Sequence, residues 1–452
     1  MKAVLIGGAA SGAGKTTVTL ALIAAARRRG LAVQAFKVGP DFIDPGHHAL
    51  ASGRPSHNLD GWMLAPAENR AIFARHARAA DLAVIEGVMG LYDGFSPVEE
   101  AGSSAEMAKL IGAPVLLTVG ARSLARTLAA LAQGFHGFDP GLTWAGLIAN
   151  QVGGPGHVEI LRQAMTLCPA LAFRGGLPRR ADLGLSERHL GLVTAEDGGL
   201  DDAGFASLAD WLEEALDLDR LLADLPELDP APAVDPAPAP ARVRIGLARD
   251  RAFCFYYAEN LRRLTAAGAE LVPFSPLNDA GLPPDLQGLY LGGGYPELHA
   301  EQLAANSALL ADIRAFAQAG GVIYAECGGM MYLGQTLADL DGREHPMAGV
   351  LELRTRMLPR LKTLGYRQVV TTAATPLGPA GVRARGHEFH YSEPTREPAT
   401  LNPYQARGRK GPEPNTLALL QHHTLASYVH LHFGSNPDLA PNLVAACARG
   451  GF

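Results

Sequence analysis

The stretch that most constrains the fold of this chain lies at its N-terminus. A short apolar run, residues 4–6, leads into the glycine-rich turn GGAASGAGKTT and then into an apolar helical run over residues 18–26. The backbone N–H groups of such a turn, and of the helix that follows it, converge on anionic oxygens. The pattern therefore predicts a phosphate-binding loop. The glycine usually found five residues before the Gly-Lys pair is replaced by Ala9 and stands at Gly8, so the loop is a variant, one residue longer than the common pattern.

This loop supplies the candidate ATP-binding residues Gly12, Gly14, Lys15, Thr16 and Thr17. Lys15 is predicted to reach the β- and γ-phosphates, and Thr16 is predicted to hold Mg²⁺. The alternative interpretation is a turn that merely connects a strand to a helix. The strand before the loop, the lysine and the threonine pair together favour the phosphate-binding interpretation.

Apolar strand candidates alternate with helical stretches through the first half of the chain, at residues 32–36, 82–85, 114–119 and 144–149. This alternation predicts an α/β fold, with a parallel sheet, helices on both of its faces and ligands at the carboxyl ends of the strands. We therefore expect the informative side chains just after the strands.

The segment after the second strand candidate, residues 37–48, contains one lysine, two aspartates and two histidines beside two prolines. We interpret it as a loop of fixed shape that presents Lys37, Asp41 and Asp44 to phosphate, metal or substrate. Asp41 is the candidate for a metal or water-shell ligand. The alternative is a solvated turn, and the two histidines are interpreted as polar loop residues rather than catalysts.

Three further polar side chains follow strand candidates. Glu86 stands where the second Mg²⁺ ligand of a nucleotide hydrolase is expected, although pairing with a buried Lys or Arg is an alternative. Asp93 belongs to the same phosphate- or substrate-facing group, or simply caps a turn. Asn150 has an amide that can read an adenine edge, or it is a turn-forming residue.

The composition excludes several classes of function. At 452 residues the chain is long enough for two or three domains, and 48% hydrophobic with 19% charged residues is typical of a globular protein. A net charge of −6 without a basic stripe argues against nucleic-acid binding. The longest apolar runs, such as residues 113–120, are too short to span a bilayer, and the N-terminus enters a strand rather than a signal peptide. We expect a cytoplasmic protein without membrane or nucleic-acid partners.

A Pro/Ala run with isolated acids, LPELDPAPAVDPAPAPAR, begins at residue 225. Such a run forms neither helix nor sheet and acts as a semi-rigid spacer. The sequence thus predicts a first domain over residues 1–224, a linker over residues 225–241 and a second domain over residues 242–452.

The second half carries a candidate nucleophile. After a strand candidate at residues 243–248 and a helical stretch at residues 256–267, residues 321–332 read as strand, sharp turn and helix with Cys327 at the turn. This arrangement resembles an elbow that exposes a catalytic side chain, and the helix N-terminus favours the thiolate. Gly328 and the turn at Gly293 are the candidate oxyanion donors. The alternative is a buried structural cysteine.

A thiol nucleophile needs a base, and histidines are frequent near the C-terminus. The segment over residues 426–433 alternates like a strand, which places His430 and His432 on one face as a base and its orienting partner. A metal site is the alternative. The four cysteines of the chain are scattered and no acidic ligand stands nearby, so the sequence does not favour metal binding there.

Seven motifs together resemble one known family. They are the loop around Lys15 and the segments KVGPDFIDP, EGVMGLYDG, LGGGYPE, AECGGMMYL, GHEFHYS and SYVHLHF, which are spread over essentially the whole chain. The chain is similar to the cobyrinate or hydrogenobyrinate a,c-diamide synthases. This resemblance implies a dethiobiotin-synthetase-like ATPase domain, followed by a class I glutamine amidotransferase domain with a flavodoxin-like α/β fold.

The resemblance also implies the chemistry. Glutamine and ATP would be used, with Mg²⁺, to amidate the a and c acetate side chains of a corrinoid polycarboxylate in cobalamin biosynthesis, through an acyl phosphate. The cysteine matching Cys327 would attack glutamine, and the histidine matching His430 would activate it. Most class I amidotransferases carry a glutamate two residues after this histidine. That position is His432 here, so the third triad member is absent and the orientation of His430 is open.

Several alternatives remain open at this point. The composition, rich in Ala, Arg and Gly, is typical of a high-GC genome and favours the metal-free acceptor, hydrogenobyrinic acid; cobalt-containing cobyrinic acid and nickel sirohydrochlorin are the alternatives. Lys37 and Arg179 are candidate cations for the carboxylates of the acceptor. A function of another class is an ATP-dependent binding switch with an inactive glutaminase module. The oligomeric state, monomer or homodimer, is not fixed by the sequence.

Overall fold

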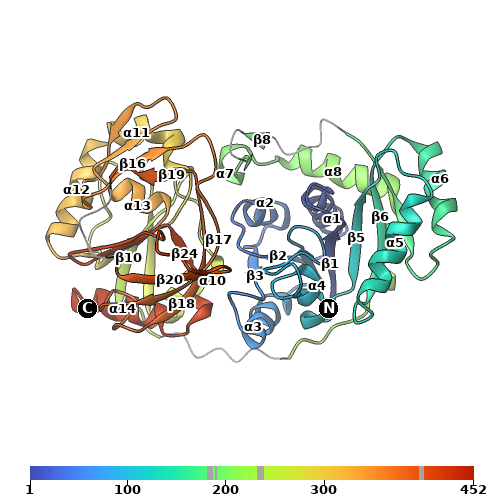
Figure 1. Cartoon of the computed structure of the whole chain (residues 1–452), viewed down its shortest axis with the longest axis horizontal. Helices are drawn as coiled ribbons and strands as arrows, with labels where there is room; N and C mark the ends of the chain where they lie inside the picture. Colours follow the sequence, from blue (N-terminus) through green and yellow to red (C-terminus); the bar gives the residue numbers. More distant parts are fainter. Residues whose placement is uncertain (181–186, 189–190, 232–238, 397–401) are drawn as a thin grey trace. The chain divides into compact units, whose positions relative to one another are not determined.

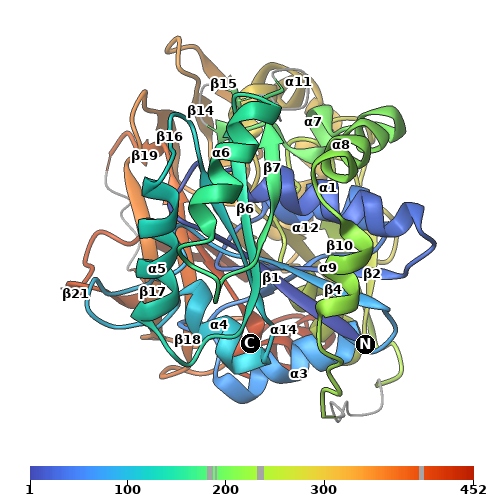
Figure 2. The same ribbon diagram turned by 90° about the vertical axis from the view of Figure 1, so that its right-hand side faces the viewer.

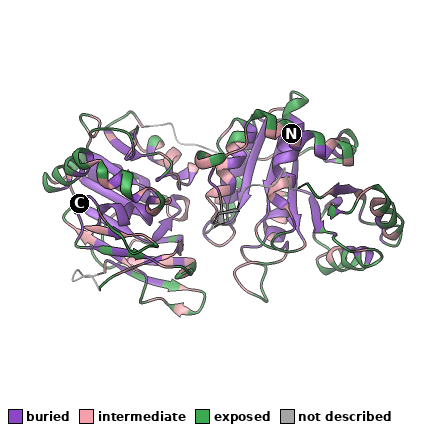
Figure 3. Ribbon diagram, turned by 90° about the horizontal axis from the view of Figure 1, so that it is seen from above, coloured by how far each residue is buried: buried purple, intermediate pink, exposed green. Residues whose placement is uncertain are grey.

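The structure is a computed structural model that describes residues 1–180, 187–188, 191–231, 239–396 and 402–452. It divides into two compact units, Met1–Val234 and Asp235–Phe452, which we call the N-terminal and C-terminal units (Figure 1). In both units the strands are buried and the exposed surface lies mainly on helices and loops (Figure 3). No helix among the described residues combines the length and the apolarity needed to cross a membrane. The expected α/β class is confirmed.

The N-terminal unit is built on a seven-stranded sheet in the order β3-β2-β4-β1-β5-β6-β7, in which every neighbouring pair is parallel. The strands are β1 Lys2–Gly8, β2 Val33–Val38, β3 His57–Leu59, β4 Leu82–Glu86, β5 Val115–Gly120, β6 Trp144–Val152 and β7 Phe173–Pro178. The predicted strands are all present, and β2, β4, β5 and β6 extend further at their carboxyl ends than predicted. The candidate side chains after them are therefore nearer to the strand ends than the sequence indicated.

Helices pack on both faces of this sheet, and Figure 2 looks onto β6, β7 and the outer helices α5 and α6. The helices are α1 Lys15–Arg28, α2 Ile43–Ser52, α3 Pro66–Ala77, α4 Ser104–Ile111, α5 Thr127–Phe138, α6 Pro155–Met165, α7 Ala195–Gly198, α8 Asp202–Ala215 and α9 Leu218–Asp224; two short strands, β8 Glu187–Arg188 and β9 Gly191–Leu192, pair with each other. One apolar core joins α1 and α8 to the strands, because both helices turn continuous apolar faces inward. This packing holds the start of α1 at the carboxyl edge of the sheet.

The structure corrects the loop predicted at residues 37–48. This segment is a strand end followed by the helix α2, which starts at Ile43 and buries Asp44 and both histidines. The first residues of the predicted linker pack on the N-terminal unit: Leu225 is buried, and the N–H of Leu228 donates to the carbonyl of Met1. The Pro/Ala segment is therefore anchored at its start.

The C-terminal unit contains a six-stranded sheet in the order β11-β10-β12-β13-β23-β22, which is parallel except for β22. Its strands are β10 Val243–Ala248, β11 Ala269–Phe274, β12 Gly288–Leu291, β13 Val322–Glu326, β22 Ala418–Gln421 and β23 Thr424–Ser427. One face is covered by α11 Ala300–Ala305, α12 Ser307–Gln318 and α13 Gly328–Leu333, and the other by α10 Ala258–Ala266 and α14 Leu439–Arg449. Between β12 and α11 lies the 3-10 turn η2 Pro296–His299.

Two smaller sheets complete this unit. An antiparallel sheet has the order β21-β20-β17-β18-β24, and a mixed sheet has the order β15-β14-β16-β19. Their strands are β14 Thr336–Ala338, β15 Glu344–Pro346, β16 Arg354–Met357, β17 Thr363–Thr371, β18 Arg383–His390, β19 Ser392–Pro394, β20 Tyr404–Gly408, β21 Gly411–Pro412 and β24 Val429–Leu431. The continuous strand predicted over residues 426–433 is wrong: β23 ends at Ser427, β24 joins a different sheet, and the 3-10 turn η3 Phe433–Ser435 follows.

Candidate functional site

The predicted phosphate-binding residues lie at the turn between β1 and α1. Gly12 and Gly14 have φ of 77° and 92°, a left-handed conformation that explains why glycine stands at both positions. Lys15 begins α1, and Thr16 and Thr17 occupy its first turn, half-buried. The turn therefore directs backbone N–H groups and the start of α1 towards one region, as an anion-binding loop requires.

Lys15 reaches across to the loop that follows β4. Its Nζ donates a hydrogen bond of 2.6 Å to the carbonyl of Met89, a residue with a left-handed φ of 47°. Burial, and then the positive charge of Lys37, lower the pKa of Lys15, against the opposing effect of nearby carboxylates. The Lys15 ammonium therefore sits among mixed charges at the carboxyl edge of the sheet.

Glu86 is the centre of a buried polar cluster. Its Oε1 accepts hydrogen bonds from Thr16 Oγ1 at 2.7 Å and from Lys37 Nζ at 2.9 Å, and its Oε2 lies 2.7 Å from Nε2 of His48. Burial alone raises the pKa of Glu86, but Lys37 and His48 outweigh it and hold that pKa well below its usual range. The alternative considered for Glu86, pairing with a buried cation, is thus present alongside its contact with Thr16.

Lys37 is enclosed by carboxylates. Its Nζ lies 2.5 Å from Asp44 Oδ2 and 3.9 Å from Asp41 Oδ2, in addition to Glu86. Burial lowers the pKa of Lys37, but the surrounding carboxylates raise it overall; burial and the neighbouring carboxylates raise the pKa of Asp44. Three carboxylates share one ammonium, so the cluster favours additional positive charge.

The structure places Asp44, rather than Asp41, beside Thr16. Asp44 Oδ1 lies 3.4 Å from Thr16 Oγ1, whereas Asp41 Oδ1 accepts the N–H groups of Ile43 and Asp44 at the start of α2. Asp93 also holds a backbone group, because its Oδ2 accepts the N–H of Gly90 at 3.0 Å, which is the turn-capping alternative named above.

Asn150, at the carboxyl end of β6, uses both ends of its amide within the protein. Its Nδ2 donates to the carbonyl of Ala13 at 3.0 Å, and its Oδ1 accepts the N–H of Gln151 at 2.8 Å. A Cβ on Gly14 would lie 2.1 Å from Asn150 Nδ2. Asn150 therefore supports the phosphate-binding loop from the side.

In the C-terminal unit, Cys327 lies on the sharp turn between β13 and α13. Its backbone has φ 47° and ψ −105°, which a non-glycine residue rarely adopts, and its N–H is fixed by the carbonyl of Ser427 at 2.7 Å. The Sγ atom donates to the carbonyl of Phe389, 3.8 Å away. A strained turn held by its neighbours is the geometry of a nucleophile elbow.

His430 lies beside this cysteine and is fully enclosed. Burial alone lowers the pKa of His430, but hydrogen bonding and charge interactions with Cys327 and Glu326 raise that pKa to about 9. A protonated imidazole next to the sulfur favours the thiolate. His387, paired with His430 across β18 and β24, has its pKa lowered to about 3 by burial and by His430, so it adds no second charge.

A carboxylate that the sequence analysis missed completes the group. Glu326 Oε2 lies 3.8 Å from His430 Nδ1, and Glu326 is held by the hydroxyls of Tyr290 and Tyr324 and by the N–H of Leu431. The sequence does contain an indication of Glu326, because this residue ends an apolar strand in the same way as Glu86.

His432 is not the orienting partner of His430, which corrects the prediction that both lie on one strand face. Its Nδ1 accepts the N–H of Gly434 at 3.0 Å, and its ring packs against Tyr257 at a centroid distance of 4.7 Å. Burial lowers the pKa of His432 to about 3. His432 therefore remains neutral and caps the turn η3.

The two glycines proposed as oxyanion donors border the Cys327–His430 pair. A Cβ on Gly293 would lie 2.4 Å from His430 Cε1 and 3.5 Å from Cys327 Cβ. A Cβ on Gly328 would lie 2.9 Å from Cδ of Pro296. Both positions require glycine because other atoms approach the backbone closely.

Comparison with known families matches each unit to a domain family. Residues 4–193 match the CobQ/CobB/MinD/ParA nucleotide binding domain, and residues 244–438 match the CobB/CobQ-like glutamine amidotransferase domain. These matches agree with the expected order of the two domains.

Similar proteins are found at nearly full length. A cobyrinate a,c-diamide synthase of Syntrophotalea carbinolica is 48% identical, over 98% of this chain and 98% of its own. Proteins of the same name from Salmonella typhimurium and from a Synechococcus species are 42% and 39% identical, over 99% of this chain and 98% of theirs. Since both domains and their order are shared over almost the whole length, the chain belongs to the family of cobyrinate a,c-diamide synthases.

Proposed function

We propose that the chain transfers ammonia from glutamine to the a and c acetate carboxylates of a corrinoid, with ATP consumed at each amidation. The observation that carries this proposal is the group formed by Cys327, His430 and Glu326 in a chain that also holds a phosphate-binding loop. The near full-length likeness to cobyrinate a,c-diamide synthases supports the same assignment. We place the reaction in the cytoplasm.

The glutaminase half proceeds through a thioester. The Cys327 thiolate attacks the side-chain amide carbon of glutamine, and the negative charge on the carbonyl oxygen is stabilised by backbone N–H groups near Gly293 and Gly328. The C–N bond then breaks, and the His430 imidazolium donates the proton with which ammonia leaves. Water, deprotonated by His430, attacks the thioester; the C–S bond breaks, glutamate leaves with its new carboxyl proton lost to solvent, and the Cys327 thiolate and His430 imidazolium are restored. Glu326 stabilises the protonated imidazole.

The synthetase half activates a carboxylate. An oxygen of the corrinoid carboxylate attacks the γ-phosphorus of ATP, ADP leaves, and ammonia displaces phosphate from the resulting acyl phosphate to give the amide. The phosphate-binding loop and Lys15 would bind and neutralise the phosphates. Asn150 supports this loop through Ala13.

The residues around Thr16 fit a magnesium ion. Thr16 Oγ1, Glu86 Oε1 and Asp44 Oδ1 are hard oxygen donors that meet at the phosphate-binding loop, in a cluster with excess negative charge. Mg²⁺ held there would neutralise charge on the transferred phosphoryl group. Asp44 replaces Asp41 as the better ligand candidate, and Lys37 is committed to these carboxylates rather than to the corrinoid.

The acceptor and the nitrogen source are tested together. The protein is incubated with ATP, Mg²⁺ and amide-labelled glutamine, in parallel with cobyrinic acid, hydrogenobyrinic acid or nickel sirohydrochlorin. We expect two successive labelled products with cobyrinic acid, each with one carboxylate charge fewer on anion exchange. We place this acceptor first because the related proteins are named for it. Efficient amidation of only one of the other macrocycles would transfer the assignment to that substrate.

An ATP-dependent binding switch with an inactive glutaminase is the competing function. It predicts ATP hydrolysis without glutamine consumption, unaffected by Cys327→Ala. The close approach of Cys327, His430 and Glu326 favours the enzyme, because an inactive module has no need of a strained cysteine beside a buried imidazole.

A further inference from the structure

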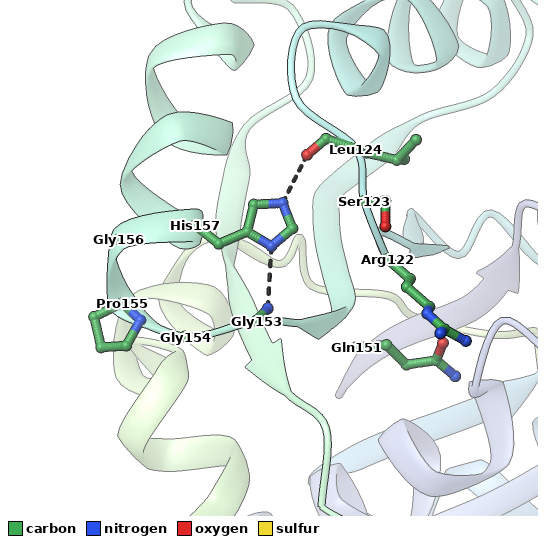
Figure 4. Close-up of a pocket in the computed structure, with 9 residues that line it drawn as sticks. All are labelled: Arg122, Ser123, Leu124, Gln151, Gly153, Gly154, Pro155, Gly156 and His157. Atoms are coloured by element: carbon green, nitrogen blue, oxygen red, sulfur yellow. Dashed lines mark hydrogen bonds between the residues drawn. The ribbon is translucent and has the colours of Figure 1, made fainter.

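A wide-open surface pocket of about 690 Å³, called the cavity below, lies at the carboxyl ends of β5 and β6, within the N-terminal unit (Figure 4). Its walls include Arg122, Ser123, Leu124, Gln151, Gly154 and His157. The volume is typical of a small-molecule site. The cavity adjoins the phosphate-binding loop, because the N–H of Ala121 donates to the carbonyl of Asn150, whose side chain in turn holds Ala13.

His157 fixes the two loops that form this cavity. Its Nδ1 accepts the N–H of Gly153 at 3.0 Å, so the ring carries its proton on Nε2, which donates to the carbonyl of Leu124 at 2.6 Å. Figure 4 shows the imidazole bridging the two loops through both nitrogens. The cavity walls are therefore cross-linked by a side chain rather than merely adjacent.

The backbone of both walls is bent in an unusual way. Ser123 and Gln151 each have a φ of 60°, in the left-handed region that non-glycine residues seldom occupy. The Gln151 bend is held by Asn150 Oδ1. Non-glycine residues in this region cluster at ligand sites, so these two bends agree with a binding role.

Arg122 gives the cavity its charge. Arg122 is exposed and forms neither an ion pair nor a hydrogen bond with any residue that the structure describes, whereas Arg28 and Arg174 of the same unit are paired with carboxylates. Figure 4 shows its side chain projecting alongside that of Gln151. No acidic residue is among those that line the cavity in the described part of the chain. A free guanidinium beside an amide suits a carboxylate, which it can bind through two hydrogen bonds.

We propose that this cavity binds a carboxylate side chain of the corrinoid other than the one being activated, and that Arg122 is its anion-binding residue. The inference rests on the proposed function and specifies how the substrate is held there. Two carboxylates of one macrocycle react in turn, so at least one more is present beside the first to react. Lys37 is committed to Asp44 and Glu86, whereas Arg122 lines the cavity and is unpaired among the described residues.

The test compares Arg122→Ala, Arg122→Lys and the control Arg126→Ala in the full-length enzyme. Arg126 is an exposed arginine of the same segment that lines a different depression, of about 410 Å³. With cobyrinic acid as the varied substrate, we expect Arg122→Ala to raise KM by roughly 10- to 100-fold, the usual effect of losing a charge-assisted hydrogen bond. Arg122→Lys should give a smaller rise. KM for ATP and glutaminase activity should stay within about twofold of the parent in all three variants, a difference that surface substitutions commonly cause.

Three results can overturn the assignment. An unchanged KM for the macrocycle in Arg122→Ala, with the parent active, would remove Arg122 from substrate binding and leave the proposed function intact. A raised KM for ATP alone would make the cavity part of the nucleotide site. Equal increases in KM for the macrocycle in Arg122→Ala and Arg126→Ala would mean that the increase reflects the overall surface charge rather than binding in this cavity. Failure of the parent to amidate any macrocycle would instead contradict the proposed function itself.

Discussion

Glu326 Oε2 lies 3.8 Å from His430 Nδ1, although the two residues belong to different sheets of the C-terminal unit. Glu326 ends β13 immediately before the nucleophile, and His430 comes from β24. The carboxylate near His430 thus comes from the residue before the cysteine, whereas the position two residues after the histidine is His432.

Replacing Glu326 by Gln is expected to lower the pKa of His430. The wild-type pKa is raised to about 9, so the imidazole is protonated at neutral pH and loses its proton as the pH rises through about 9. Without the carboxylate, only Cys327 remains to oppose the effect of burial on the pKa of His430, so the proton is lost at lower pH. The upper transition in the pH dependence of Cys327 alkylation by iodoacetamide should therefore shift to lower pH. Glutaminase kcat should fall roughly tenfold or more, as expected when acid–base catalysis is impaired.

The control for this variant is Tyr324→Phe, which removes a hydrogen bond to Glu326 but keeps its charge. An alkylation profile in Glu326→Gln identical to that of the parent would show that Glu326 does not set the protonation of His430.

Gly293→Ala is expected to displace His430, since the added Cβ would lie 2.4 Å from His430 Cε1. We expect glutaminase kcat to fall by about 100-fold, because small displacements of a reacting group are costly. Ammonia-dependent amidation should be retained. Gly134→Ala, at an exposed helical position where no atom lies within 4 Å of the added Cβ, is the matched control and should be neutral. Full glutaminase activity in Gly293→Ala would mean that His430 has room to move without loss of function.

Lys37→Met should destabilise the N-terminal unit. It leaves the buried carboxylates of Asp44 and Glu86 without their shared ammonium, a change that costs about 3–5 kcal/mol in comparable buried pairs. Lys109→Met, which breaks partly exposed pairs with Glu100 and Asp139, should cost about 1 kcal/mol or less. Urea denaturation followed by circular dichroism measures both. Equal losses in the two variants would argue against a buried charge cluster.

Asp44→Asn should raise the concentration of Mg²⁺ needed for activity more than Asp41→Asn does. Asp44 lies beside Thr16, whereas the Asp41 oxygen that accepts the N–H groups of Ile43 and Asp44 is retained in asparagine. The concentration of Mg²⁺ that gives half-maximal ATP-dependent amidation is the measurement. A larger increase for Asp41→Asn would restore Asp41 as the metal ligand.

The two glycine-containing turns and the strands of the parallel sheet could be predicted from the sequence, because each depends on local requirements of the backbone or of burial. The glycines at residues 12 and 14 are required by a turn with left-handed φ, and the two glycines after Cys327 are required because Pro296 and Leu291 approach their backbone closely, so both turns leave a clear pattern. The strands of the parallel sheet are nearly continuous apolar runs, because both of their faces are covered.

Other features depend on contacts between distant residues. Pro45 and Gly46 indicate a loop, yet Pro45 lies in the first turn of α2, where its missing N–H costs nothing. Lys37 meets Glu86 because β2 and β4 are neighbours in the sheet, and the sequence of neither segment indicates the order of the strands. The alternation over residues 426–433 suggests one strand, but it does not reveal that the chain passes from one sheet to another at Tyr428.

The most direct test of the account is the activity of Cys327→Ala with two nitrogen sources. With glutamine, the variant should form no corrinoid amide. With ammonium chloride at alkaline pH, it should amidate the same substrate with ATP at a rate close to that of the parent. Glutamine-dependent amidation by Cys327→Ala at the rate of the parent would contradict the account, because nitrogen would then reach the acceptor without the thioester.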